Sequence, residues 1–405
     1  MEQKKVLTPT YMRDFSCIGA DCEDTCCSGW QITIDEKSYN RLLDEDDNEN
    51  NLSLSQHVKL LKSSNSNSEN YAEIVLNSQS FCPLLSENRL CTLHKEKGEE
   101  FLPNICAAFP RISNIVNGNY EKSLTLSCPE AARKVLLNEE GIRFDEMFEE
   151  IGGKQLLNGK INTVKLQGVK RERNYFLELR EISINILQNR DLSLSSRLIK
   201  LGEFLKEVHK SLVNSIDGNI QYQIEMFKHI TVCYKGREGG NASSFSTEAQ
   251  VTLIRGLIDK SIFTGIKEKR YLNCLLEALE GLKYTGSNLN QESVDIFNYH
   301  SSKLTDKYEH ILENYLVNYC FKNLFPVTKG LLEDYMILIV HYALIKFHLI
   351  GLMNRYEDQF NTQHIITLVQ SFSRNIEHSY NESSKFIDFL KENEITSFES
   401  VSVLI

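Results

Sequence analysis

The sequence predicts a mainly α-helical protein in two parts: a small cysteine-rich α+β domain at residues 1–150 and a large all-helical domain at residues 151–405. Cysteine and proline indicate the division, because eight of the 11 cysteines and five of the six prolines lie before residue 130. Proline breaks the helical hydrogen-bond ladder, so its scarcity later in the chain favours helices. Apolar residues there recur at helical spacing, as at Leu198, Leu201 and Leu205.

The elements expected in the first part are short. Strands bounded by polar turns are predicted at residues 31–34, 71–76, 81–85, 89–93, 112–116 and 120–126. The pair 81–85 and 89–93 reads as a hairpin, and Asn117-Gly118 predicts a second hairpin. Helices are expected at 36–43, capped by Asp35, and at 128–137, with proline at the first helical position.

The second part is predicted to be a series of helices. Their expected spans are 249–263, 271–282, 301–325, 330–353, 362–378 and 385–392. The stretch 335–353 is apolar enough to raise the question of a membrane span. Because it contains His341, Lys346 and His348, which are costly in hydrocarbon, we expect a buried core helix instead.

Composition limits the classes of function. The chain has 41% apolar residues, 25% charged residues and a formal net charge of −10. These values are typical of a folded globular protein and give no basic footprint for nucleic acid, so we expect neither a nucleic-acid nor a membrane partner. An acidic surface suits lysine-rich partners. The N-terminus lacks the apolar region of a signal peptide, which favours a cytoplasmic protein with reduced thiols.

Clustered thiols in a reducing compartment favour metal binding over disulfides. The candidate ligands are Cys17, Cys22, Cys26, Cys27, Cys82, Cys91, Cys106 and Cys128. Thiolates select zinc, copper(I) or iron–sulfur clusters. Paired CxxC knuckles typical of structural zinc are absent from the sequence, so the pattern favours an iron–sulfur cluster, with zinc as the alternative. Adjacent Cys26 and Cys27 are expected to point in different directions, and Cys233, Cys274 and Cys320 to be buried packing residues.

Several segments resemble those of one known family. They are Phe15-Ser16-Cys17, Cys22 to Trp30, Cys82-Pro83-Leu84, Cys106 with Pro110-Arg111, Leu126 to Glu130, Glu313 to Tyr315 through Phe325-Pro326, and Ser373-Arg374 with Glu377-His378. They look like the flagellin lysine-N-methylases, and the resemblance spans nearly the whole chain. It implies a bacterial, cytoplasmic enzyme that transfers methyl groups from S-adenosylmethionine to lysine side chains of flagellin, with a [4Fe–4S] cluster on the cysteines.

The bare sequence supports methyl transfer only weakly. The glycines at 152–153 and 236–240 lack the spacing and context of a Rossmann turn. Radical enzymes usually bind their cluster through a CxxxCxxC motif. The spacing Cys22-x3-Cys26 matches the first interval of that motif, but Cys27 follows Cys26 directly and does not match the second interval. The alternative function is therefore a non-catalytic metal-binding or electron-transfer module on a helical interaction domain.

Individual residues suggest roles that compete with ordinary packing. Four residues could act as a base or orient the amine in lysine methylation, or could simply lie on the surface or pack in the core. They are His94, Tyr120, Glu377 and His378. Arg111 could hold the cofactor carboxylate or form a structural ion pair. Trp30 could shield the cluster or be a core aromatic. The helical domain is expected to recognise flagellin, and a fragment ending near residue 150 is expected to keep its metal but not to methylate flagellin.

Overall fold

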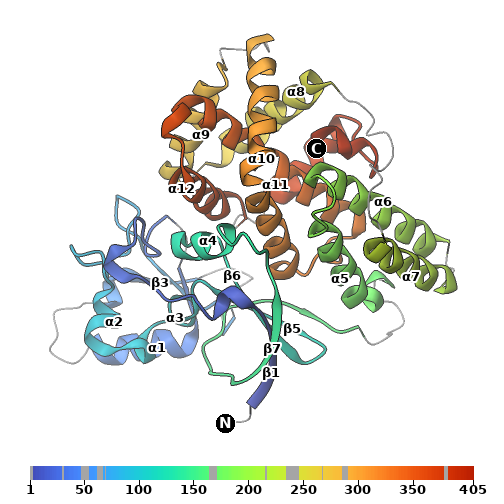
Figure 1. The fold of residues 1–405 in the computed structure, drawn as a ribbon. Helices are drawn as coiled ribbons and strands as arrows, with labels where there is room; N and C mark the ends of the chain where they lie inside the picture. The colour runs from blue at the N-terminus through green and yellow to red at the C-terminus, as the bar shows by residue number, and fades with distance from the viewer. Residues whose placement is uncertain are drawn as a thin grey trace.

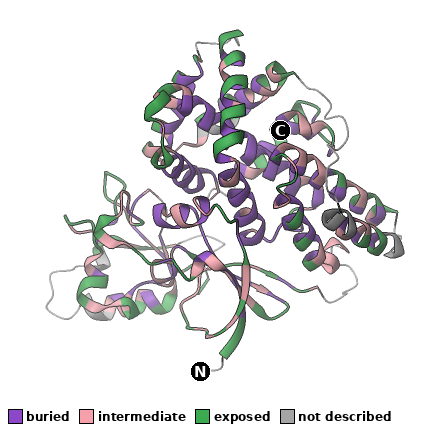
Figure 2. Cartoon of the chain, in the orientation of Figure 1, coloured by how far each residue is buried: buried purple, intermediate pink, exposed green. Residues whose placement is uncertain are grey.

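The computed structural model describes residues 3–29, 32–46, 54–61, 67–68, 70–163, 171–214, 217–233, 246–266, 268–284, 291–377 and 382–405. Figure 1 shows a sheet-containing N-terminal region beside a larger assembly of helices. The predicted fold class is thus confirmed. In the burial view, the buried segments concentrate where the helices meet one another and around α4 (Figure 2).

The N-terminal region contains two sheets. The larger has the order β7-β1-β6-β5-β8 and consists of β1 (Gln3–Pro9), β5 (Arg111–Val116), β6 (Asn119–Leu124), β7 (Phe144–Glu150) and β8 (Leu157–Ile161). The smaller, antiparallel sheet has the order β2-β4-β3 and consists of β2 (Thr33–Ile34), β3 (Val58–Leu60) and β4 (Ala72–Ile74). Four helices accompany them: α1 (Glu36–Asp46), α2 (Thr92–Lys97), α3 (Asn104–Ala108) and α4 (Pro129–Leu136).

Local sequence signals explain several of these elements. The hairpin β5–β6 turns at Asn117 and Gly118, whose φ angles are 51° and 84°, as a tight hairpin turn with two left-handed residues requires. The Asp35 side chain accepts the backbone N–H of Ser38 at 2.9 Å and so caps α1 as predicted. Pro129 stands at the start of α4, also as predicted.

Other expectations need correction. The hairpin expected between 81–85 and 89–93 is reduced to an isolated bridge between Leu85 and Cys91, because α2 begins at Thr92. Strands β1, β3, β7 and β8 were not predicted. β7 lies at the edge of the sheet, and its sequence FDEMFEE has neither a continuous apolar run nor a strict alternation of apolar and polar residues.

The C-terminal region is helical. From residue 247 onward its helices correspond to the predicted spans, although the helix expected at 301–325 begins ten residues earlier, at Gln291, and no span was predicted for the helix Asp217–Cys233. The helices of the region are α5 (Phe176–Leu187), α6 (Leu194–Val213), α7 (Asp217–Cys233), α8 (Thr247–Leu257), α9 (Lys269–Gly281), α10 (Gln291–Lys322), α11 (Leu331–Tyr356), α12 (Thr362–Phe372) and α13 (Glu382–Glu392). A π-helical turn at Ser373–Glu377 extends α12. The segment Leu331–Gln359 is long and apolar enough to cross a membrane by composition, but 94% of its most apolar window is buried inside the protein, as in a core helix.

Two hydrophobic cores hold the molecule together, and they do not follow the boundary predicted near residue 150. The larger core joins the helices of the C-terminal region to residues of the N-terminal sheet and α4, among them Leu124 and Val135. The smaller core lies around the β2-β4-β3 sheet, with Ile34 and Leu93 buried in it. Because the larger sheet continues to Ile161 and shares its core with the helices, the N-terminal region is packed as part of the whole chain.

Candidate metal centre

The structure places the eight N-terminal cysteines on loops and at helix ends. Cys17 to Cys27 lie in the loop region after β1, Cys91 and Cys128 stand at the N-terminal ends of α2 and α4, and Cys106 lies in α3. None of the eight forms a disulfide bond. Such positions allow residues far apart in sequence to gather around one ion.

The first group of thiols, Cys26, Cys27, Cys82, Cys91 and Cys106, surrounds the smaller core. Four of its members are buried in this core or packed against it: Cys27, Cys82, Cys91 and Cys106. The Sγ atoms of Cys26 and Cys27 are 4.0 Å apart, so the expectation that these neighbours point in different directions is wrong. The backbone N–H of Cys82 donates to the Cys27 carbonyl at 2.7 Å, which holds the two loops together.

The electrostatics of this group show that its members influence one another. Burial, with smaller contributions from the charges of Cys91 and Cys26, raises the pKa of the Cys82 thiol to about 11. Burial also raises the pKa of Cys106, with added contributions from Cys91, Cys82 and Cys26. Deprotonating several of these thiols together is therefore unfavourable without a cation among them.

The second group consists of Cys17, Cys22 and Cys128. Burial, with smaller contributions from the charges of Cys22 and Cys17, raises the pKa of Cys128 to about 12. Cys17 likewise raises the pKa of Cys22, after the larger effect of burial. The pair Cys22 and Cys26, which the radical-enzyme spacing would place on one cluster, thus falls in two different groups.

The thiols are suitable ligands for a soft metal, and there are enough of them for a four-ligand site. Zinc–thiolate bonds of about 2.3 Å in a tetrahedron put the sulfur atoms about 3.8 Å apart, close to the 4.0 Å between Cys26 and Cys27. Among the residues that the structure describes, no three His, Cys, Asp or Glu side chains already stand as a closed ligand group. The thiols of each group are neighbours, but their sulfur atoms do not converge on one metal position.

Residues of α12 and the following π-turn hold the loop that carries Cys22, Cys26 and Cys27. One nitrogen of the Arg374 guanidinium donates to the Asp24 carboxylate at 2.8 Å, and the other donates to the Thr25 carbonyl at 2.6 Å. The Gln370 amide nitrogen donates to Asp24 at 2.8 Å and to the carbonyl of Ser127, the residue before Cys128, at 3.0 Å. One amide therefore links the two loops that carry the second group of thiols.

The same loop is held at Glu23 and Gly29. The Glu23 carboxylate accepts from Arg133 at 2.7 Å and from Gln363 at 3.1 Å. The Glu268 carboxylate lies so close to Gly29 that a Cβ added there would meet its oxygen at 2.5 Å. Gly29 also has a φ of +76°, which favours glycine at this position, whereas the Glu268 side chain could rotate away from a Cβ. Burial raises the pKa of the Glu268 carboxyl group.

The remaining predicted candidates are spread over the molecule or lie outside the described residues. Glu377 is buried in the helical core, where Tyr315 donates to it at 2.8 Å and Lys322 forms an ion pair with it. Arg111 is exposed, with its guanidinium 5.1 Å from the ring centroid of Phe15. His94 is exposed on α2. His378 and Trp30 lie outside the described residues. The catalytic roles of all these residues stay predictions.

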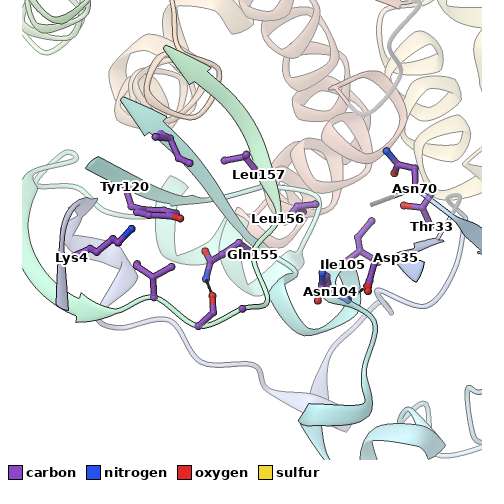
Figure 3. A pocket seen from close by; sticks show the side chains of 14 residues that line it. Lys4, Thr33, Asp35, Asn70, Asn104, Ile105, Tyr120, Gln155, Leu156 and Leu157 are labelled. Atoms are coloured by element: carbon purple, nitrogen blue, oxygen red, sulfur yellow. Dashed lines mark hydrogen bonds between the residues drawn. The ribbon is translucent and has the colours of Figure 1, made fainter. Parts of the chain in front are cut away.

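Tyr120 lines a cavity of about 600 Å³ between the two sheets (Figure 3). Lys4 and Gln155 accompany it on the side of the larger sheet, and Lys4 Nζ lies 5.6 Å from the Tyr120 ring centroid. On the opposite side Asp35 and Asn104 face the cavity, and the Asn104 backbone N–H donates to Asp35 at 3.4 Å. Asn104 begins α3 and Ile105 also lines the cavity, so the lining is adjacent in sequence to Cys106.

The comparison with known families covers both parts of the chain. Residues 180–404 match the family model of the FliB lysine N-methylase C-terminal domain, which is more than half of the chain. The chain belongs to the FliB lysine N-methylase family. Residues 16–129 match a second family model, described as a putative zinc- or iron-chelating domain.

Individual relatives match over a shorter stretch. The lysine-N-methylases of Salmonella choleraesuis (strain SC-B67) and Salmonella typhimurium (strain LT2) are each 34% identical over 147 residues, which is 36% of this chain and 36% of theirs. The flagellar biosynthetic protein FliU of Salmonella muenchen is 33% identical over 147 residues, 36% of this chain and 85% of that protein. The matches thus span about a third of the length of the two methylases. No solved structure matches the chain.

The sequence analysis did not identify Gln370, Asp24 and Glu268 as candidate functional residues. A usable signal was present, because Gln363, Thr367, Gln370 and Arg374 repeat at helical spacing in an otherwise apolar segment. Arg374 appeared only within the family resemblance, and its partner could not be read from the sequence, since Asp24 lies 350 residues away.

Proposed function

We propose that this chain is a protein-lysine N-methyltransferase that transfers methyl groups from S-adenosylmethionine to lysines of flagellin in the cytoplasm. The observation that carries the proposal is the match of residues 180–404 to the methylase family, over the same region that holds the cysteine loop through Arg374 and Gln370. The net charge of −10 suits a lysine-bearing substrate surface.

The reaction requires a neutral lysine amine. Its nitrogen lone pair attacks the methyl carbon of the sulfonium, the new N–C bond forms, and the C–S bond breaks with its electron pair left on sulfur. The proton of the resulting ammonium then passes to a base or to water. Because the unperturbed pKa of lysine is about 10.4, the enzyme must favour the neutral amine by desolvation or by a neighbouring positive charge.

We propose that S-adenosylmethionine binds in the cavity lined by Tyr120. Its volume of about 600 Å³ lies in the usual range for small-molecule sites, about 300–1,000 Å³. The Lys4 ammonium offers a partner for a carboxylate, and the Tyr120 ring face attracts a cation such as a sulfonium. Ile105 and Leu156 give an apolar wall for the adenosine.

We propose further that the cysteines hold a metal centre, with a [4Fe–4S] cluster favoured and zinc as the alternative. Thiolates are suitable ligands for both, and the first group alone contains enough donors for a four-ligand site. The ligands that we assign to the centre are Cys26, Cys27, Cys82, Cys91 and Cys106, with Cys17, Cys22 and Cys128 able to form a second site.

The decisive experiment is transfer of a labelled methyl group from S-adenosylmethionine to purified flagellin by the full chain handled without oxygen. We expect label on flagellin lysines, and none when the flagellin lysines are chemically blocked beforehand. Absence of label with intact, metal-loaded protein would favour the non-catalytic metal-binding module instead. For the cavity, Tyr120→Ala should weaken S-adenosylmethionine binding about tenfold in equilibrium dialysis, whereas Tyr299→Ala, at a side chain that is 57% exposed in the helical region, should not.

A further inference from the structure

A polar stripe on α12 and its π-turn faces the cysteine loop. Gln363, Thr367, Gln370 and Arg374 follow one another three or four residues apart, which puts them on one side of the helix. Gln370 is fully buried and Arg374 is 6% exposed. A helix in this position would ordinarily present apolar residues to its neighbour.

Outside the stripe itself, these side chains contact residues beside the thiols, or Arg270, which in turn contacts such a residue. Gln363 contacts Glu23 beside Cys22, and Arg374 contacts the Thr25 carbonyl beside Cys26. Thr367 accepts at 3.2 Å from Arg270, whose other terminal nitrogen donates to the Glu23 carbonyl at 3.4 Å.

Gln370 occupies the centre of this arrangement. Its nitrogen bridges Asp24 and the carbonyl before Cys128, while its Oε1 atom is buried without a hydrogen-bond partner among the residues that the structure describes. A buried amide oxygen without a hydrogen-bond partner lowers the free energy of unfolding. Such an amide is therefore expected where its nitrogen makes needed contacts or where a further group binds the oxygen.

We propose that Arg374 and Gln370 are positioning residues of the cysteine sites: the helical domain supplies the contacts that hold Cys26 of the first group, and Cys22 and Cys128 of the second group, where metal can bind them. The inference rests on the proposed metal centre and adds a role for the C-terminal region in building it. Outer-shell partners that fix metal ligands typically change metal affinity by about 10–100-fold when removed.

This inference reverses one expectation from the sequence. A fragment ending near residue 150 lacks both side chains, as well as the helices that share the larger core, and is now expected to lose its metal. The cysteine-rich segment alone has the ligands but not the contacts that hold their loop.

The experiment uses the full chain, purified without oxygen, in four forms: unchanged, Arg374→Lys, Gln370→Met and, as a control, Arg355→Lys. Lysine is a point charge and cannot reproduce the two-pronged contact of Arg374 with Asp24 and Thr25. Arg355 forms an exposed ion pair with Glu280 in the same region, with side chains 47% and 64% exposed. Iron, zinc and sulfide per chain, the rate of metal loss to a chelator and the melting temperature are measured for each.

We expect Arg374→Lys and Gln370→Met to lose metal about ten times faster or more, and Arg355→Lys to behave like the unchanged protein. If Arg374→Lys fails to fold, the proposal is decided by Gln370→Met, because this substitution keeps the length of the side chain. Variants that melt earlier but hold metal as tightly as the unchanged chain would show a merely structural role and overturn the proposal. If the unchanged chain holds no metal, the metal centre and this inference both fall. Methylation of flagellin is assayed separately, so a lack of methylation does not change how the metal measurements are interpreted.

Discussion

The carboxylate of Glu377 lies in the helical core with both oxygen atoms engaged. Ser373 donates to one oxygen at 2.7 Å and Tyr315 to the same oxygen at 2.8 Å, while Lys322 pairs with the other. Lys322 and His341 together hold the pKa of this carboxyl group down at about 2, against the effect of burial. These contacts favour a structural role for a residue that the sequence offered as a catalytic candidate.

Removing the cation from this pair should be costly. Lys322→Met leaves Glu377 charged and buried without its main partner, so we expect a loss of about 3–5 kcal/mol in the free energy of unfolding. Arg355→Met removes an exposed pair and should cost at most about 1 kcal/mol. Denaturant unfolding followed by circular dichroism measures both. Equal losses in the two variants would contradict the role assigned to Glu377.

His348 should make the protein sensitive to mild acid. Burial lowers its pKa from 6.5 to about 4, and its Nδ1 atom lies 2.6 Å from the Leu344 carbonyl. The folded state therefore binds fewer protons than the unfolded state between these values, so stability is full above pH 6.5 and falls as the pH drops toward 4. The loss from this one group is about 2 kcal/mol at pH 5.

The variant His348→Gln isolates this effect. It should be less stable than the unchanged protein at pH 7.5, but the difference should shrink as the pH falls to 5, because only the histidine must lose a proton to fold. His341 has its pKa lowered to about 4 in the same way, mainly by burial, and faces Glu377 and Lys322. A constant difference between variant and unchanged protein across this range would show that His348 is not buried in its neutral form.

At the scale of elements, α9 and α11 approach so closely that glycine is needed on both helices. A Cβ at Gly281 would meet the Gly351 carbonyl oxygen at 1.9 Å, and a Cβ at Gly351 would meet the Ala278 carbonyl oxygen at 2.2 Å. Backbone atoms cannot move aside as a flexible side chain can. The two helices would have to separate along their contact.

Gly351→Ala should therefore destabilise the protein by about 3 kcal/mol or more. Gly152→Ala is the matched control, since nothing lies within 4 Å of a Cβ built there. Thermal unfolding of the two variants gives the comparison. A melting temperature of Gly351→Ala equal to that of the control would mean that the α9–α11 contact is looser than described.

Sequence patterns predicted elements well where the cause is local. The turn at Asn117-Gly118, the Asp35 cap and the helices from α8 to α13 follow from turn residues, caps and periodicity. The edge strand β7 and the strand β1 were missed, because their pairing partner is distant and only the assembled sheet stabilises them. Tertiary context decides such strands.

At the scale of the whole molecule, the cysteine ligands could be proposed from sequence but their grouping could not. The two groups combine thiols of the loop after β1 with Cys91, Cys106 and Cys128, which lie in or at the start of α2, α3 and α4. The contacts of Arg374 and Gln370 with this loop join segments some 240–350 residues apart. No local pattern encodes a pairing at that separation.

The whole-molecule account also predicts that substrate binding depends on salt. A net charge of −10 attracts a lysine-bearing surface, and exposed charges are screened over about 8 Å at physiological ionic strength. The KM for flagellin should therefore rise between 50 and 300 mM salt, while the affinity for S-adenosylmethionine in equilibrium dialysis changes less. A KM for flagellin that is independent of salt would exclude electrostatic steering.

The most direct test of the central claim, that the N-terminal thiols form a metal centre within a lysine methylase, is the metal content of matched cysteine variants. Cys91→Ser alters a member of the first group, whereas Cys274→Ser alters a buried thiol in the helical core. On protein purified without oxygen, we predict that iron or zinc per chain falls sharply in Cys91→Ser and stays at the level of the unchanged chain in Cys274→Ser. Equal metal content in all three proteins would contradict the account.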